Sequence, residues 1–235
     1  MAYFDHFAQG KATRLGDWLT QRTIARQFGF LARHLPSNNT LLQILEIGPG
    51  HGEFAAEFLN RGYRNYDVVE PNPTLRTKLQ AIGVRNARDY LIPNLMEEDN
   101  SYDLIIICDV FEHLNDTREA LRFISEARRV LAPGGLLFIL SPDLMDWRED
   151  FYNCDFSHSN PTTVRRTLEM FQNENLEPLE FTYTYSCFGG IVGYLLNKLV
   201  KSITFWTIGE STDFKPYKLR LTFLRRFMVI GRKPK

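Results

Sequence analysis

The chain has 235 residues, of which 44% are apolar and 13% aromatic, so it can bury a sizeable core and is not disordered as a whole. Its 28 basic residues balance 28 acidic ones, which gives no support for broad electrostatic capture of nucleic acid or of an anionic membrane. Three widely spaced cysteines, Cys108, Cys154 and Cys187, predict neither a disulfide framework nor a metal site, and they favour a reducing, cytoplasmic environment.

The first 36 residues are predicted to form a helical cover. The stretch "MAYFDHFAQGKATRLGDW" carries charges early and lacks an apolar centre, so we do not interpret it as a secretory signal. Apolar residues then recur at helical spacing until Pro36 ends the pattern. These residues are Ile24, Phe28, Leu31 and Leu35.

Strand and helix patterns alternate through residues 40–145. The predicted strands are "LLQILEI", "YDVVEP", "VRNAR", "YDLIIICDV" and "GLLFILSP". Asn72 and Pro73 indicate the cap and first turn of one of the helices between them. The uninterrupted apolar run Ile105–Ile107 suits a parallel strand covered on both faces. This alternation predicts an α/β fold with a mostly parallel sheet.

Three further elements are predicted after residue 145. They are a helix in "NPTTVRRTLEMFQNENLEP", a strand in "LEFTYTY" and a closing strand in "LRLTFLRRFMVIGRK". Residues 187–216 fall between the two strands and are expected to be an insertion rather than a separate domain. We therefore expect one domain over residues 1–235.

The stretch "ILEIGPGHGEF" places Gly48, Gly50 and Gly52 between a predicted strand and a predicted helix. Glycines let a backbone turn tightly and approach a ligand closely, and the start of a helix offers unpaired amide groups. A plain tight turn is the alternative interpretation. Glu70 ends the second strand, at the edge of a doubly wound sheet where ligands bind, and its carboxylate can accept both hydroxyls of a ribose.

Two features of the loop disfavour a nicotinamide-dependent oxidoreductase. Its fingerprint needs a third glycine at the position of Glu53, whereas this chain has GxGxG. Glu46, just ahead of the loop, offers nothing to a pyrophosphate but would attract a ligand with a charged amino group.

At this point the sequence resembles the class I S-adenosylmethionine-dependent methyltransferases, over roughly residues 40–145. "LEIGPGHG", "VVEPNP", "YDLIIICDVFEHL" and "RVLAPGGLLFILSPD" are similar to four motifs of that family, in the family's order. The resemblance implies a Rossmann-like, doubly wound sheet of seven strands, with an antiparallel C-terminal strand and helices on both faces. It also implies S-adenosylmethionine as cofactor, with 40–145 as the cofactor-binding core and 146–235 as the substrate-side half.

Site residues follow from the same resemblance. It implies that Gly48, Gly50 and Gly52 pack under the methionine part of the cofactor, with Glu46 attracting its amino group and Glu70 holding the ribose. Two later acids complete the implied set: Asp89 would meet the adenine amine with Tyr90 beside it, and Asp109 would lie near the methionine amino group and the transferred methyl. A solvated loop acid is the alternative for Asp89.

Methyl transfer needs mainly alignment, and an oxygen acceptor usually also needs a base. His113, just past the fourth strand, and His158, three residues after Asp155, are the candidate catalytic residues. Alternatively, His113 is a structural histidine, and His158 with Asp155 forms a helix-capping loop. Weaker candidates for the wall of the acceptor site are Asp143, Trp147 and Tyr152.

Residues 188–207 have an amphipathic pattern. The apolar side comprises Phe188, Ile191, Val192, Leu195, Leu199, Ile203 and Trp206, and the polar side comprises Asn197, Lys198, Lys201 and Thr204. The polar residues argue against a membrane-spanning helix. We favour a helix packed on the domain; the alternatives are a lid over an apolar acceptor and a weak contact with a membrane surface.

The leading hypothesis is a methyltransferase that acts on a small molecule or a saccharide, at oxygen. RNA or protein methylation and a non-catalytic cofactor-binding module are the alternatives. Nucleic acid is disfavoured because no basic stripe with interleaved aromatic residues appears. The local exceptions are Arg14, Arg22, Arg26 and Arg33 on the predicted N-terminal helix.

Overall fold

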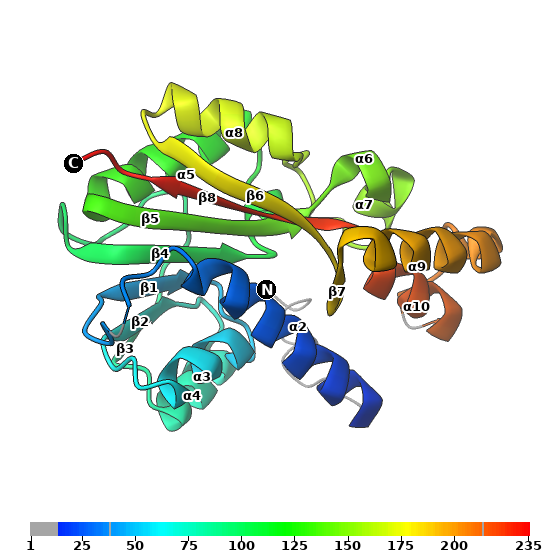
Figure 1. The fold of residues 1–235 in the computed structure, drawn as a ribbon, viewed down its shortest axis with the longest axis horizontal. Helices are drawn as coiled ribbons and strands as arrows, with labels where there is room; N and C mark the ends of the chain where they lie inside the picture. The colour runs from blue at the N-terminus through cyan, green and yellow to red at the C-terminus, as the bar shows by residue number, and fades with distance from the viewer. Residues whose placement is uncertain (1–13, 38, 213) are drawn as a thin grey trace.

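The structure, a computed structural model, describes residues 14–37, 39–212 and 214–235. Within these residues an eight-stranded sheet runs in the order β3-β2-β1-β4-β5-β8-β6-β7, with helices on both faces (Figure 1). The strands are β1 Ile44–Ile47, β2 Tyr66–Val69, β3 Asn86–Arg88, β4 Tyr102–Cys108, β5 Leu131–Pro142, β6 Glu177–Tyr185, β7 Phe188–Gly189 and β8 Arg226–Arg232.

The helices alternate with the strands and then gather at the C-terminal half. They are α2 Arg14–Ala32, α3 Glu53–Asn60, α4 Pro73–Ile82, η1 Phe111–His113, α5 Thr117–Val130, α6 Leu144–Trp147, α7 Glu149–Asn153, α8 Val164–Asn173, α9 Gly190–Ile203, η2 Phe205–Thr207 and α10 Lys215–Phe223. As the sequence predicted, Asn72 caps α4 and accepts hydrogen bonds from the N–H groups of Thr74 and Leu75, with Pro73 at its first position.

The strand pairing confirms the predicted Rossmann-like α/β fold. β1 to β5 pair in parallel, and β8 enters antiparallel between β5 and β6. The structure has eight strands where seven were expected, because Phe188 and Gly189 fold back on the end of β6 as the short strand β7.

Two apolar layers fill the space between the sheet and its helices. α5 and α8 cover one face, where Phe123 and Phe171 are fully buried. α2, α3 and α4 cover the other face, where the rings of Phe28 and Phe58 meet edge to face at 4.9 Å between centroids. β4 lies between the two layers with Ile105, Ile106 and Ile107 buried, as its uninterrupted apolar run predicted.

The C-terminal stretch 219–233, predicted as one strand, is divided between α10 and β8. Pro216 lies in the first turn of α10, where its missing N–H breaks no helical hydrogen bond. Tyr217 and Arg220, three residues apart, are buried on one side of this helix, and Arg220 Nε donates to Asp150 Oδ2 at 2.7 Å. The prediction of a continuous strand was wrong because the buried pair Tyr217 and Arg220 has helical spacing, and the continuously buried run of β8 begins only after it.

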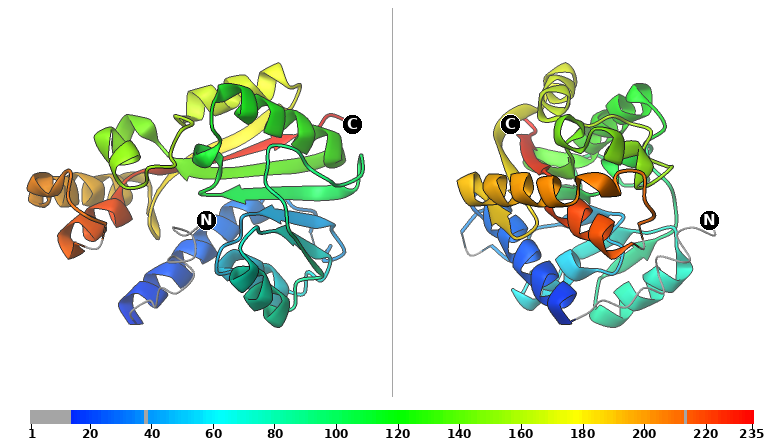
Figure 2. Two further views of the ribbon diagram at one scale, coloured as in Figure 1. Left: turned by 180° about the vertical axis from the view of Figure 1, so that it is seen from behind. Right: turned by 90° about the vertical axis from the view of Figure 1, so that its right-hand side faces the viewer.

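α9 lies with α10 beyond the end of the sheet (Figures 1 and 2), and it packs through the side opposite to the expected one. Asn197 and Thr204 are buried. Asn197 Nδ2 donates to Asp146 Oδ2 and to the carbonyl oxygen of Phe223, both at 2.9 Å, while Lys201 Nζ donates to the main-chain oxygen of Asp146 at 2.7 Å. The expectation of apolar packing was wrong because the buried Asp146 carboxylate draws the polar side inward.

The apolar side of α9 and of the turn after it faces outward. Its exposed fractions range from 55% to 74%, for Ile191, Val192, Leu195, Leu199, Ile203 and Trp206. We call these six residues the α9 apolar face. No helix among the described residues has both the length and the hydropathy of a membrane span.

α2 connects distant parts of the molecule. Its first half lies near the β6–β7 turn, where Thr23 Oγ1 is 3.4 Å from Ser186 Oγ. After its end, His34 Nε2 lies 2.8 Å from Glu180 Oε2, and Arg33 Nη2 donates to Glu180 Oε1 at 2.9 Å. The basic side chains of this helix therefore do not form one free stripe. Residues 1–13 of the predicted cover lie outside the described residues.

Candidate active site

The glycine loop after β1 has a backbone that only glycine adopts easily. Gly48, Gly50 and Gly52 have φ angles of 63°, 56° and 82°. A Cβ atom on Gly48 would come within 2.5 Å of Val110 Cγ2, and one on Gly52 within 2.7 Å of Leu79 Cδ2. Gly52 is also the N-cap of α3, so the free amides of that helix open toward the loop.

Glu70 stands directly beside this loop. Its Oε1 accepts the N–H of Asn72 at 2.8 Å, and its carboxylate also accepts the main-chain N–H of Gly50. Burial raises the pKa of Glu70, while these two hydrogen bonds favour the charged form. The structure therefore brings the second-strand acid and the glycine loop together, as the sequence predicted for one site.

Glu46, in β1, is turned into the protein. It is 2% exposed and accepts the phenolic O–H of Tyr66 at 2.8 Å. Burial raises the pKa of Glu46 to about 8, with the charges of Glu53 and Glu70 adding to the effect. Glu46 is thus a neutral, hydrogen-bonded carboxyl group near pH 7 rather than an open charge.

Asp89 and Tyr90 point in opposite directions. The Asp89 side chain is 64% exposed and pairs with Arg76 Nη2 of α4 at 2.8 Å. Tyr90 is buried and its hydroxyl donates to Glu97 Oε2 at 2.5 Å. Of these two neighbours, only the Asp89 carboxylate reaches the surface beyond β3.

Asp109 follows β4 with a left-handed backbone, at φ 53°, which is uncommon for a residue with a side chain. Its carboxylate forms an ion pair with Arg226 at the start of β8. This pair holds the ends of two strands together at the edge of the sheet where the glycine loop lies.

The two predicted catalytic histidines are neighbours. Their ring centroids are 4.8 Å apart, although 45 positions separate His113 from His158 in the sequence. The carbonyl oxygen of Glu112 in η1 accepts the main-chain N–H groups of Ser159 and Asn160, both at 3.0 Å. These bonds fix the segment that carries His158 against the one that carries His113.

Hydrogen bonds determine which nitrogen of each ring carries its proton. His113 Nδ1 lies 2.8 Å from Ser157 Oγ, and Ser157 donates its own proton to Asp155 Oδ1 at 2.6 Å. His158 Nδ1 lies 2.6 Å from the carbonyl oxygen of Phe151, which can only accept. Both rings are therefore protonated at Nδ1. Burial lowers the pKa of both histidines, so both are neutral with an acceptor lone pair on Nε2.

Glu112 is a site residue that the sequence interpretation missed. It is 1% exposed, and its Oε2 accepts the hydroxyl proton of Ser141 of β5 at 2.8 Å. Burial raises the pKa of Glu112 to about 8, and the nearby charge of Asp109 adds to the effect. The available signal was a carboxylate directly before His113 at the end of a buried strand.

Comparisons with known proteins agree with this geometry. A family model described as a methyltransferase domain matches residues 18–180, more than half of the chain. The chain belongs to this methyltransferase family. It is a class I S-adenosylmethionine-dependent methyltransferase, and S-adenosylmethionine is its methyl donor. No curated protein matches it.

Solved structures share the methyltransferase's fold at low sequence identity. One is a candidate sarcosine dimethylglycine methyltransferase from Galdieria sulphuraria, with 18% identity and a TM-score of 0.64 over 91% of this chain and 86% of the other. Another, a candidate histamine N-methyltransferase from Thermotoga maritima, has 16% identity and a TM-score of 0.61 over 92% of both chains. The [4+2]-cyclase SpnF has 15% identity and a TM-score of 0.62 over 89% and 81%. At such identities these likenesses show the fold alone.

The residues expected to form the wall of the acceptor site occupy different environments in the methyltransferase. Asp143 caps α6 and pairs with Arg225 at 2.8 Å, and Trp147 Nε1 donates to the main-chain oxygen of Arg225 at 2.7 Å. Tyr152 is exposed, with its ring against Phe151. The first two residues therefore make structural contacts, while Tyr152 presents most of its ring to solvent.

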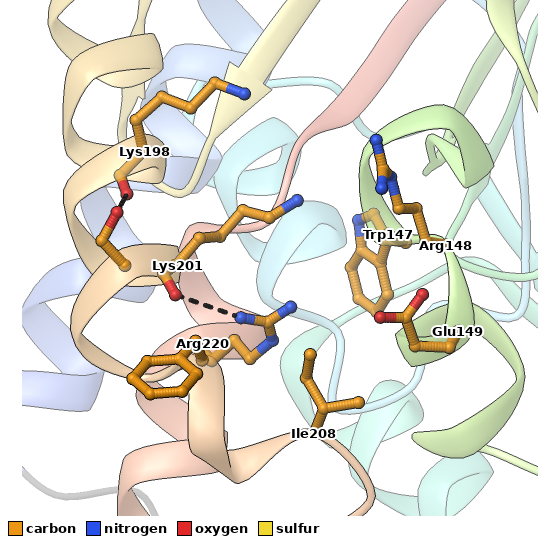
Figure 3. Close-up of a pocket in the computed structure, with 9 residues that line it drawn as sticks. Trp147, Arg148, Glu149, Lys198, Lys201, Ile208 and Arg220 are labelled. Atoms are coloured by element: carbon orange, nitrogen blue, oxygen red, sulfur yellow. Dashed lines mark hydrogen bonds between the residues drawn. The ribbon is translucent and has the colours of Figure 1, made fainter.

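An open pocket of about 420 Å³ separates α6 and α7 from α9 and α10. Figure 3 shows Lys198 and Lys201 reaching from α9 toward Trp147 and Arg148 across this space. Its lining combines basic and apolar groups: Trp147, Arg148, Glu149, Lys198, Lys201, Ser202, Phe205, Ile208 and Arg220. The pocket borders η2, so it adjoins the α9 apolar face.

Proposed function

We propose that this methyltransferase transfers the methyl group to an oxygen atom of a small-molecule or saccharide acceptor bound beside His113 and His158. The observation that carries the proposal is the pair of neighbouring imidazoles, each with its Nδ1 held by a hydrogen bond, so that Nε2 is the nitrogen that would take a proton. His113 follows β4, which pairs with β1, the strand that leads into the glycine loop, and His158 lies against His113.

The cofactor positions follow from the loop geometry. We place the methionine part of S-adenosylmethionine over Gly48, Gly50 and Gly52, and its ribose hydroxyls on Glu70. Asp89 is assigned to the adenine amine. Tyr90, the next residue, is buried and supports this segment from inside the protein. Asp109 and Glu46 are assigned to the side of the methionine amino group, and residues 146–235 to the acceptor.

The transfer itself is an in-line displacement. The acceptor oxygen forms a bond to the methyl carbon while the carbon–sulfur bond breaks, which yields S-adenosylhomocysteine. The hydroxyl proton passes to an imidazole Nε2, because a neutral histidine can take it near pH 7. A neutral amine acceptor would need no base at this moment, so two placed neutral imidazoles favour oxygen over nitrogen.

Labelled cofactor and fractionated cell extract would identify the acceptor. His158→Ala should then lower turnover while cofactor affinity stays nearly unchanged, because His158 is assigned to the acceptor alone. His34→Ala, which removes a histidine paired with Glu180 elsewhere, is the matched control and should keep full turnover. Label found only on amines, or full turnover of His158→Ala, would overturn the proposal.

We also propose that the α9 apolar face lies on an anionic lipid surface. It offers six exposed apolar side chains, while the sequence from 190 to 209 contains two lysines and no acidic residue. The pocket beside η2 adds Arg148, whereas Arg220 is buried against Asp150 and Lys201 is paired with Asp146. An apolar face with aromatic residues and a basic border is the pattern of helices that lie in a membrane interface.

Flotation with vesicles of phosphatidylglycerol and phosphatidylcholine tests this contact. Ile191→Ser combined with Leu195→Ser should abolish co-flotation, whereas Met96→Ser, at the same 74% exposure as Ile191 but outside this face, should not. High salt should weaken binding by screening the lysines. Equal flotation of all variants would overturn this contact. A wild-type protein that does not bind vesicles but forms a dimer, which the two serine substitutions dissociate, would show that the face is a protein interface instead.

A further inference from the structure

We propose that Glu112, His113 and His158 bind a divalent transition-metal ion. Each of the three offers one ligand atom, and these atoms all lie within 4.8 Å of one another in the described residues. They come from η1 and from the segment after α7, so the chain brings together a carboxylate and two imidazoles that the cofactor does not use.

The orientation of both rings is what a metal site requires. A ligating histidine presents one unprotonated nitrogen and donates its other N–H to a carbonyl or to a carboxylate-linked group. Here His158 donates Nδ1–H to the carbonyl of Phe151, and His113 donates Nδ1–H to Ser157, which is itself bound to Asp155. One nitrogen of each histidine and one carboxyl oxygen of Glu112 thus converge on the same place.

The surroundings favour a cation. Asp109 interacts electrostatically with all three residues, and Asp155 does so with both histidines. Ser141 holds one oxygen of the Glu112 carboxylate at 2.8 Å. The main-chain bonds from Ser159 and Asn160 to the Glu112 carbonyl keep the two segments in register. These bonds therefore hold the two ligand-bearing segments close together before any ion arrives.

The donor set indicates the class of metal. Two imidazole nitrogens with one carboxylate suit Zn²⁺, Mn²⁺ or Co²⁺, whereas Mg²⁺ and Ca²⁺ prefer oxygen ligands. With ligands at about 2.1 Å, two donors on a tetrahedral ion lie about 3.4 Å apart. The largest separation in the cluster, up to 4.8 Å, exceeds this spacing by about 1.4 Å, so the ligand atoms must draw together by that amount when an ion binds. Three protein ligands leave a coordination position open.

The use of that open position rests on the proposed function. A hydroxyl bound there would lose its proton more easily, as metal-bound water does. The O–H bond breaks, the proton leaves to solvent water, and the oxygen forms its bond to the methyl carbon as the carbon–sulfur bond breaks. Both histidines are then ligands of the ion. The ion, rather than a histidine, is therefore the group that activates the acceptor.

Metal binding can be measured without any acceptor. Chelator-treated protein titrated with Co²⁺ should develop visible absorbance that saturates at one equivalent. In a second titration, followed by calorimetry, Zn²⁺ should displace the bound Co²⁺. Glu112→Gln and His158→Asn should weaken binding by more than about tenfold, and Ser157→Ala by about tenfold through lost ring orientation. His34→Asn should bind as wild type does. Unfolding curves in chelator verify that each variant is folded.

The outcomes separate this site from the proposed function. No Co²⁺ absorbance, or equal affinity in Glu112→Gln and wild type, overturns the metal site and leaves oxygen methylation through a histidine base intact. Metal-dependent methyl transfer lost in chelator and restored by Mn²⁺ or Zn²⁺ supports the metal site and its role in the reaction. Full transfer by the chelated protein, once the acceptor is known, overturns the role of the ion in the reaction.

Discussion

The helix after the glycine loop, α3, and the helix α9 are both amphipathic, but they turn opposite sides toward the protein. At α3, just after the loop, the apolar residues Phe54, Phe58 and Leu59 are buried, as their spacing predicts. At α9 the apolar residues are exposed and Asn197 is buried instead. Hydrophobic periodicity therefore identifies the two sides of a helix, but not which side meets the protein.

The difference has an identifiable cause. α3 covers an apolar sheet face and has only van der Waals partners to satisfy. α9 lies beyond the sheet, where Asp146 accepts hydrogen bonds from Asn197, Lys201 and the main chain of Arg225. An unsatisfied buried carboxylate is more unfavourable than an exposed leucine, so the polar side packs inward. The exposed apolar side is then available to another surface.

Gly50→Val is expected to have the largest effect. A β-branched residue at φ 56° costs about 1–3 kcal/mol of strain and fills the space assigned to the cofactor, so affinity should fall more than about 100-fold in calorimetry. Gly190→Val is the matched control at the start of α9, with φ 57° and no atom near its Cβ. Equal loss of cofactor affinity in both variants would mean that strain alone is responsible.

The pH dependence of stability should differ between the two regions. Glu46 has a pKa raised to about 8. Its contribution to the free energy of unfolding is therefore full below about pH 4.5 and is lost as the pH rises toward 8, at up to about 1.4 kcal/mol per pH unit. Asp146 has a lowered pKa, so its contribution is present above about pH 4 and is lost in acid.

Denaturant unfolding of Glu46→Gln and Asp146→Asn across pH 3 to 9 measures this contrast. As the pH is raised from 5 to 8, Glu46→Gln should lose less stability than wild type. As the pH is lowered below 4, Asp146→Asn should lose less stability than wild type. Parallel curves for wild type and Glu46→Gln above pH 5 would contradict the buried, neutral state assigned to Glu46.

Glu70→Ala should weaken cofactor binding by about tenfold or more, because a hydrogen bond to a charged group contributes roughly 1.5–3 kcal/mol. The same change also removes the acceptor of the Gly50 N–H, so the loop loses a support. Glu70→Gln keeps an acceptor and should recover part of the affinity. An unchanged dissociation constant in Glu70→Ala would remove Glu70 from the cofactor site.

The smallest predicted effect compares the two sides of α9. Asn197→Ala should lower the free energy of unfolding by about 1–3 kcal/mol, because Asp146 and the Phe223 carbonyl each lose a donor. Leu199→Ala, at 57% exposure, should change it by less than about 0.5 kcal/mol. Thermal unfolding that ranks the two in reverse order would mean that the apolar side is the packed one.

The fold of residues 40–145 was predicted well from the sequence because its signals are local. Strand runs, the Asn72 cap and the glycine spacing depend on neighbours within a few residues, and the order of strands in the sheet follows from parallel strand–helix units. The family resemblance placed Glu70 beside the loop, and the structure finds it hydrogen-bonded there.

Residues 146–235 depend on long-range partners that no local pattern reveals. The burial of Asn197 depends on Asp146, and α10 is fixed by Arg220 pairing with Asp150, 70 positions away. The sequence interpretation named no metal ligand, and the proposed site joins Glu112 and His113 to His158, 45 positions beyond His113 in the sequence. Each of these features is decided by a buried charge whose partner comes from another element.

The position of α2 has a consequence for how the molecule is made. Its contact with α3, through Phe28 and Phe58, can form as soon as α2 and α3 have left the ribosome. Two polar partners arrive much later: Glu180, which meets His34 just after α2, lies 146 positions downstream, and Ser186, which meets Thr23, lies 163 positions downstream. In a nascent chain that pauses before β6, α2 therefore lacks these contacts, and the synthesis of β6 and the turn after it supplies them.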